Sequence, residues 1–128
     1  MKGIMTILIA FTMIILEGCD KMPINGDLDG QWQVMEIDLV DGNIEKPTQL
    51  YYCFSLHTVY LSAPGSGVGG NMTYDGTTLT LDISDAEKAT DLLPWGINSI
   101  VTNFDVVALS SGRMILKSDY AVIQFRKF

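Results

Sequence analysis

Apolar and polar residues alternate in short stretches along most of this chain, and turn-forming residues separate the stretches. A period of two is typical of strands that bury one face, and regular turn signals between short strands favour an antiparallel barrel or sandwich. A break in the alternation near Met35 and Glu36 predicts a bulge in the first strand. The eight predicted strands are residues 30–39, 49–56, 58–62, 70–74, 77–83, 100–109, 114–118 and 121–128.

Turn residues fix several of the predicted connections. Asp75-Gly76 lies between two strand-like stretches and predicts a two-residue hairpin turn, and residues 41–43 (Asp-Gly-Asn) predict another turn. Residues 64–70 are rich in glycine but lack the Lys-Ser/Thr ending of a phosphate-binding loop, so we expect a plain connection between strands there.

One short helix is predicted between the fifth and sixth stretches. Ser84 and Glu87 have the spacing of a capping box, and Pro94 is expected to stop the helix near Leu93. The pattern as a whole therefore predicts an all-β domain with one short helix.

The N-terminus has the layout of an export signal. Lys2 precedes an almost unbroken apolar run, residues 4–16, which is followed by Glu17-Gly18-Cys19. The run is about 13 residues long, whereas a spanning helix needs roughly 18 to 20. We therefore expect residues 1–18 to be a removable signal peptide, residues 19–29 a tether and residues 30–128 the folded domain.

Residues 16–19 (Leu-Glu-Gly-Cys) resemble the lipobox of bacterial lipoproteins. Glu17 departs from the pattern, because this position of a lipobox usually carries a small or apolar residue. The resemblance implies that Cys19 carries acyl chains such as palmitate. It also implies a lipid-anchored protein of the cell envelope, most simply at the outer membrane, facing the periplasm or the cell exterior. An ordinary signal peptide cut near Gly18, with Cys19 left as a free thiol, is the alternative.

Charge and cysteine content narrow the function classes. The chain has 8 basic and 15 acidic residues, a net charge of −7, and removing Lys2 and Glu17 leaves that balance unchanged. We therefore do not expect nucleic acid as a partner, because proteins bind its phosphate backbone with clustered Lys and Arg. With Cys19 acylated, only Cys53 remains, so we expect no disulfide and a Cys53 that acts as a small hydrophobe.

Gly30-Gln31-Trp32 is similar to the Gly-x-Trp motif that opens the first strand of lipocalins. Residues 28–128 resemble the small lipocalin-like lipoproteins of Gram-negative bacteria, with further likeness at residues 92–97 and 123–127. The resemblance implies an eight-stranded antiparallel barrel of the calycin type. It also implies that Trp32 closes one end, with the Arg126 guanidinium packed across its indole.

Candidate catalytic and metal-binding residues are few. His57 is the single histidine, and Ser55 shares its strand face without any nucleophile elbow. The acidic residues Asp82, Asp85, Glu87 and Asp91 lack calcium-loop spacing and are expected to favour the helix start. We therefore expect no enzyme activity, no metal and no cofactor.

Aromatic residues give the ligand hypothesis. A small lipophilic or amphipathic ligand is expected to contact Tyr52, Phe54, Tyr60, Phe104 and a partly exposed Trp95 at the barrel mouth. A barrel of this size can also be filled by its own side chains. The alternative function is then an interaction module that contacts another envelope protein or a polysaccharide.

Overall fold

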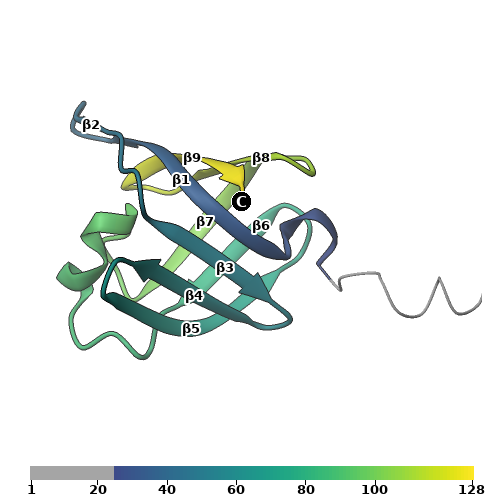
Figure 1. The fold of residues 1–128 in the computed structure, drawn as a ribbon, viewed down its shortest axis with the longest axis horizontal. Coiled ribbons are helices and arrows are strands. Elements are labelled where there is room, and N and C mark those ends of the chain that lie inside the picture. The colour runs from purple at the N-terminus through teal and green to yellow at the C-terminus, as the bar shows by residue number, and fades with distance from the viewer. Residues whose placement is uncertain (1–24) are drawn as a thin grey trace, which may run out of the picture.

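The structure, a computed structural model, describes residues 25–128 (Figure 1). The predicted signal peptide, Cys19 and most of the predicted tether lie outside these residues. The elements are η1 (Gly26–Leu28), β1 (Gly30–Leu39), β2 (Ile44–Glu45), β3 (Tyr51–Ser55), β4 (Thr58–Ala63), β5 (Ser66–Tyr74), β6 (Thr78–Asp82), η2 (Ala89–Trp95), β7 (Val101–Leu109), β8 (Arg113–Lys117) and β9 (Ala121–Lys127).

The strands form a closed antiparallel barrel. From β3 to β9 each strand pairs with the next, and β1 pairs with both β3 and β9. The predicted eight-stranded antiparallel barrel is therefore confirmed. The additional strand β2 has two residues and pairs only with Ile37 and Asp38 of β1. The predicted bulge is confirmed as well, because the β1–β9 register shifts between Val34 and Glu36.

The glycine-rich stretch is not the plain loop that its composition predicts. β5 begins at Ser66, and its first residues pair with β4 in a regular register. A Cβ at Gly67 would overlap the ring of Tyr60, and a Cβ at Gly70 would overlap the backbone of Asp82 and Ile83. Glycine is used here because neighbouring groups occupy the side-chain space, not because the chain must bend.

The predicted short helix is confirmed, but it begins later and continues further than the sequence indicated. Ser84 lies in a turn, and η2 is a 3₁₀ helix that begins at Ala89. Pro94 lies inside η2, which ends at Trp95 and is capped by Gly96 in the left-handed conformation (φ 80°). Ala86 packs against the core, and such a tertiary contact outweighs a local capping preference. Neither helix among the described residues has the length and hydropathy needed to cross a membrane.

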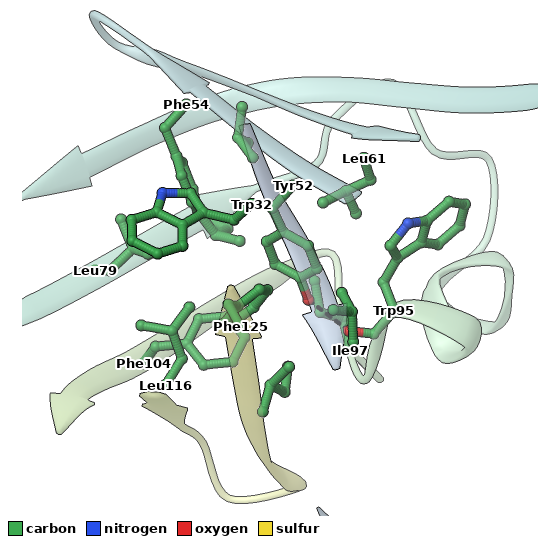
Figure 2. Packing of buried hydrophobic residues seen from close by; sticks show 14 of the residues in the cluster. Trp32, Tyr52, Phe54, Leu61, Leu79, Trp95, Ile97, Phe104, Leu116 and Phe125 are labelled. Atoms are coloured by element: carbon green, nitrogen blue, oxygen red, sulfur yellow. Dashed lines mark hydrogen bonds between the residues drawn. The ribbon is translucent and has the colours of Figure 1, made fainter. Parts of the chain in front are cut away.

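Side chains fill the interior of the barrel (Figure 2). Phe125 packs edge-on against Tyr52, with ring centroids 4.8 Å apart, and Phe104 and Leu116 belong to the same buried cluster. Inward residues alternate with outward ones along most of the strands, as in β9, where Ala121, Ile123 and Phe125 are buried. Of the two sequence interpretations, the structure shows the filled interior.

The two ends of the barrel differ. η1 lies at one end, at the right of Figure 1, together with the β3–β4 turn. Residues 83–100, including η2, lie at the other end, at the left of the figure. We call these the closed end and the open end.

Trp32 is buried next to η1, and its basic partner is Lys127 instead of the predicted Arg126. Trp32 is fully buried, donates from Nε1 to the Leu28 carbonyl at 2.8 Å, and pairs in register with Lys127. The Lys127 Nζ lies 4.4 Å from the indole centroid and donates to the carbonyls of Asp27 and Asp29. Arg126 points to the outer face because adjacent residues of a strand point in opposite directions.

The two basic residues should differ in their effect on stability. We expect Lys127→Met to lower the free energy of unfolding by about 2 kcal/mol, because it removes a cation–π contact and two charge-assisted hydrogen bonds. Arg126→Met loses one exposed bond to Gln33 and should cost less than about 0.5 kcal/mol. Urea unfolding of both variants measures the difference, and an equal cost would contradict the assigned partner.

Candidate functional site

A groove of about 390 Å³ lies at the open end, between the β4–β5 hairpin and the segment that contains η2. One wall comes from the hairpin and the other from residues 85–95. Apolar groups of Ala63, Val68, Ala86, Pro94 and Trp95 form much of the surface. The full lining is Ala63, Ser66, Gly67, Val68, Asp85, Ala86, Glu87, Asp91, Pro94 and Trp95.

Trp95 is fixed in the groove wall by hydrogen bonds to two different strands. Its Nε1 donates to the Ser62 carbonyl at 3.1 Å, and its own carbonyl accepts a bond from the Tyr52 hydroxyl (Figure 2). Gly96 follows in the left-handed conformation and ends η2 by donating to the Leu92 and Leu93 carbonyls. Trp95 is 5% exposed, so the partly exposed side chain that we expected is instead a fixed wall of the groove.

Three carboxylates line the same groove. Asp85, Glu87 and Asp91 are exposed, and no Lys, Arg or His lies among the lining residues. Asp85 and Glu87 precede η2, so the helix-start role that the sequence predicted does not apply to them. Their summed field disfavours an anionic ligand and favours a neutral or cationic one.

The structure brings most of the predicted ligand-contacting residues together, but it does so in the buried core. Tyr52, Phe54 and Phe104 are buried in the filled interior, whereas Tyr60 is 45% exposed on the outer face of β4. Only Trp95 of the predicted set lines the groove. Burial also raises the pKa of the Tyr52 hydroxyl well above its ordinary value, so the hydroxyl that binds Trp95 stays protonated.

The candidates for chemistry remain dispersed. His57 and Ser55 are exposed at the closed end, far along the barrel from the groove. Cys53 is half-buried on the outer face of β3, and burial raises the pKa of its thiol, which lowers its reactivity. Within residues 25–128, no group of three or more His, Cys, Asp or Glu side chains comes together to hold a metal ion.

One pair of carboxyl groups is close together, on the outer face of β1. A hydrogen bond with the Asp38 side chain raises the pKa of Glu36, and the Glu36 oxygens also approach Gln124 Nε2 at 3.2 Å and Lys46 Nζ at 3.8 Å. Neither residue lines the groove. The pair is therefore separate from the candidate site.

The sequence interpretation missed most of the groove. Its hairpin wall comes from the stretch that was expected to be a plain loop, and its other wall comes from the acidic segment that was assigned to helix capping. The useful signal was the concentration of Asp85, Glu87 and Asp91 in the ten residues before Pro94-Trp95-Gly96. That signal becomes informative only when the fold places the segment against β5.

Comparison with known proteins agrees with the architecture. The lipocalin-like domain family matches residues 13–128. A lipocalin-like protein from Bacteroides uniformis is 23% identical, with a TM-score of 0.68 over 80% of this chain and 100% of its own. An uncharacterized protein from Bacteroides eggerthii is 19% identical, with a TM-score of 0.65 over 78% and 98%. A search of curated proteins found no match.

Proposed function

The chain belongs to the lipocalin-like domain family, and from this premise we propose that it is a lipoprotein of the cell envelope that binds a small amphipathic ligand. Cys19 would carry the lipid anchor, and the groove beside Trp95 would hold the ligand. The proposal involves no catalytic step and no cofactor.

The groove is the observation that carries this proposal. Its volume of about 390 Å³ falls within the range of roughly 300 to 1,000 Å³ that is typical of small-molecule sites. Because side chains fill the barrel, the ligand would lie along Trp95 and Pro94 outside the interior. This location keeps the expected Trp95 at the barrel mouth but not the barrel-lining residues Tyr52, Phe54 and Phe104.

Charge selects the class of ligand. A hydrocarbon portion would pack against Trp95, Ala63 and Val68, while Asp85, Glu87 and Asp91 would surround the polar head. A cationic or neutral head satisfies these carboxylates, whereas a fatty-acid carboxylate is repelled by them. We therefore propose a long-chain amine or a neutral amphiphile as the ligand class.

The tether would direct the groove away from the membrane. Asn25 is held at the closed end, where its side chain donates to Leu56 and Asp29. Five residues lie between Cys19 and Asn25, so the two are six chain steps apart and the reach is at most about 20 Å. An anchor at Cys19 would thus leave the open end accessible to ligands in the aqueous compartment.

A substitution that fills the groove tests the site. Ser66 is exposed in the groove wall, so Ser66→Phe should occupy the site without disturbing the core, and we expect it to weaken binding of a nitroxide-labelled alkylamine at least tenfold. Quenching of tryptophan fluorescence measures the binding. Val107→Phe adds the same ring to an exposed position on β7 outside the groove and should leave binding unchanged.

The same titration with a nitroxide-labelled fatty acid should give weaker binding than the amine. If alkylamine quenching were equal in Ser66→Phe and Val107→Phe, the groove would not be the ligand site. The filled interior favours a second candidate function in that case. The protein would then be an interaction module that contacts another envelope protein or a polysaccharide through its outer surface.

A further inference from the structure

A second hollow at the open end is polar and shares no residue with the groove. Its volume is about 250 Å³, and it lies between the segment that leads into β7 and the β8–β9 turn. The lining residues are Asn98, Ser99, Val101, Thr102, Asn103, Ser118, Asp119 and Tyr120. We call it the polar pocket.

Internal hydrogen bonds hold both walls of the polar pocket in place. The Thr102 hydroxyl donates to the Ser99 carbonyl at 3.1 Å. The Ser118 Oγ accepts bonds from the backbone N–H groups of Tyr120 and Ala121, both at 3.2 Å. The Val40 N–H donates to the Tyr120 carbonyl at 2.9 Å, which joins the turn to the end of β1. The pocket is thus formed before any ligand arrives, so ligand binding costs little conformational entropy of the protein.

Other polar side chains of the polar pocket have donors or acceptors that could hydrogen-bond to a ligand. The Asn103 Oδ1 accepts from the Thr80 hydroxyl at 2.7 Å, which leaves its amide N–H groups available. In the part of the chain that the structure describes, the side chains of Asn98, Ser99, Asp119 and Tyr120 make no hydrogen bond to protein. Donors and acceptors are therefore interleaved around one small volume.

The composition of the polar pocket identifies a class of ligand. No Lys, Arg or His lines it, so it offers no countercharge to a phosphate or a carboxylate. Hydroxyls and amides both donate and accept, which matches the hydroxyl groups of a sugar, and one carboxylate can accept from two neighbouring hydroxyls. Tyr120 and Val101 add apolar surface for the C–H face of a sugar ring.

We propose that the polar pocket binds a neutral saccharide of one or two rings, with Asp119 and Asn98 as its principal hydrogen-bonding groups. The pocket is smaller than the range of roughly 300 to 1,000 Å³ for drug-sized ligands, which suits a monosaccharide or disaccharide. The proposal goes beyond the amphipathic-ligand function, because it uses different residues and a different ligand chemistry.

The test titrates neutral saccharides into the full-length protein in phosphatidylcholine nanodiscs, whose headgroups carry no sugar. The probes are glucose, galactose, mannose, N-acetylglucosamine and their disaccharides, followed by calorimetry. We expect at least one to bind. Asp119→Ala should weaken that binding about tenfold or more, because a charge-assisted hydrogen bond is lost, and Asn98→Ala should weaken it several-fold.

Two control variants separate this site from others. Asp105→Ala removes an exposed carboxylate from β7 outside the polar pocket and should leave saccharide binding unchanged. Ser66→Phe blocks the groove and should also leave it unchanged, so the two proposals can fail independently. The proposal is overturned if no probe binds, or if binding persists at full strength in both Asp119→Ala and Asn98→Ala.

A second experiment distinguishes a soluble saccharide from the end of a polysaccharide. It measures binding to glycans that are attached to a solid support through their reducing ends. Binding to the fixed glycans supports recognition of a terminal unit of an envelope polysaccharide. Binding of the free sugars alone supports a soluble saccharide. Both results uphold the polar pocket as a saccharide site.

Discussion

Replacing Cys19 with serine is expected to abolish acylation and to leave the precursor at its full length. Acylation requires the thiol of Cys19, and processing of a lipoprotein signal depends on the acylated cysteine, as the resemblance of residues 16–19 to a lipobox implies. Each buried CH₂ of an acyl chain contributes about 0.8 kcal/mol, so a multiply acylated cysteine holds a domain on the membrane durably. Cys19→Ser should remove this anchor completely.

Labelling with radioactive palmitate, together with the intact mass of the purified protein, measures this effect. The protein with Cys19 in place should incorporate the labelled palmitate and lose residues 1–18. The Cys19→Ser variant should do neither. Cys53→Ser provides a matched control, because the chain has two cysteines and Cys53 lies in β3. An unlabelled chain that is still cut after Gly18 would indicate an ordinary signal peptide and would remove the anchor from the proposed function.

The strands could be predicted from the sequence because each buries one face. The alternation in β9 places Ile123 and Phe125 inward, and the same parity places Lys127 inward rather than Arg126. The partner of Trp32 could thus have been identified from the pattern, without the family expectation. By contrast, the strand at Ser66–Gly70 was hidden, because glycine gives no alternation and its pairing depends on what lies beside it.

The candidate site was less accessible to prediction. Tyr52, Phe54 and Phe104 point inward as the alternation indicates, but whether inward aromatics line a cavity or fill it depends on the barrel radius. The groove joins residues 63–68 to residues 85–95, and the polar pocket joins residues 98–103 to residues 118–120. Such combinations arise from the placement of whole loops, which local patterns do not specify.

Tyr52 connects the filled interior to the groove, and its replacement is expected to have a large effect on stability. The ring is fully buried against Phe125, and the hydroxyl donates to the carbonyl of Trp95. Tyr52→Ala should lower the free energy of unfolding by about 3 to 5 kcal/mol, because it leaves a cavity in addition to the lost apolar contact. Small domains are stable by only about 5 to 15 kcal/mol, so this variant should unfold at much lower urea concentration.

Tyr52→Phe keeps the ring and isolates the hydroxyl. At pH 7 we expect a loss of about 1 to 3 kcal/mol, because the Trp95 carbonyl loses its partner. Burial raises the pKa of Tyr52 in the folded state, whereas in the unfolded chain a tyrosine has a pKa of about 10. Below about pH 10 both states are protonated and the contribution of Tyr52 is complete. Above it, the unfolded state loses its proton first, so stability falls as pH rises towards the folded pKa.

The unmodified protein should therefore lose stability more steeply above pH 10 than Tyr52→Phe does, by about 1.4 kcal/mol per pH unit. Urea unfolding at pH 7, 9 and 11 measures both slopes, and the remaining tyrosines are common to the two proteins. Parallel slopes between pH 9 and 11 would mean that the Tyr52 hydroxyl reaches solvent. Because that hydroxyl fixes the backbone of Trp95, Tyr52→Phe should also weaken alkylamine binding in the groove, which connects the stability of the barrel to its proposed function.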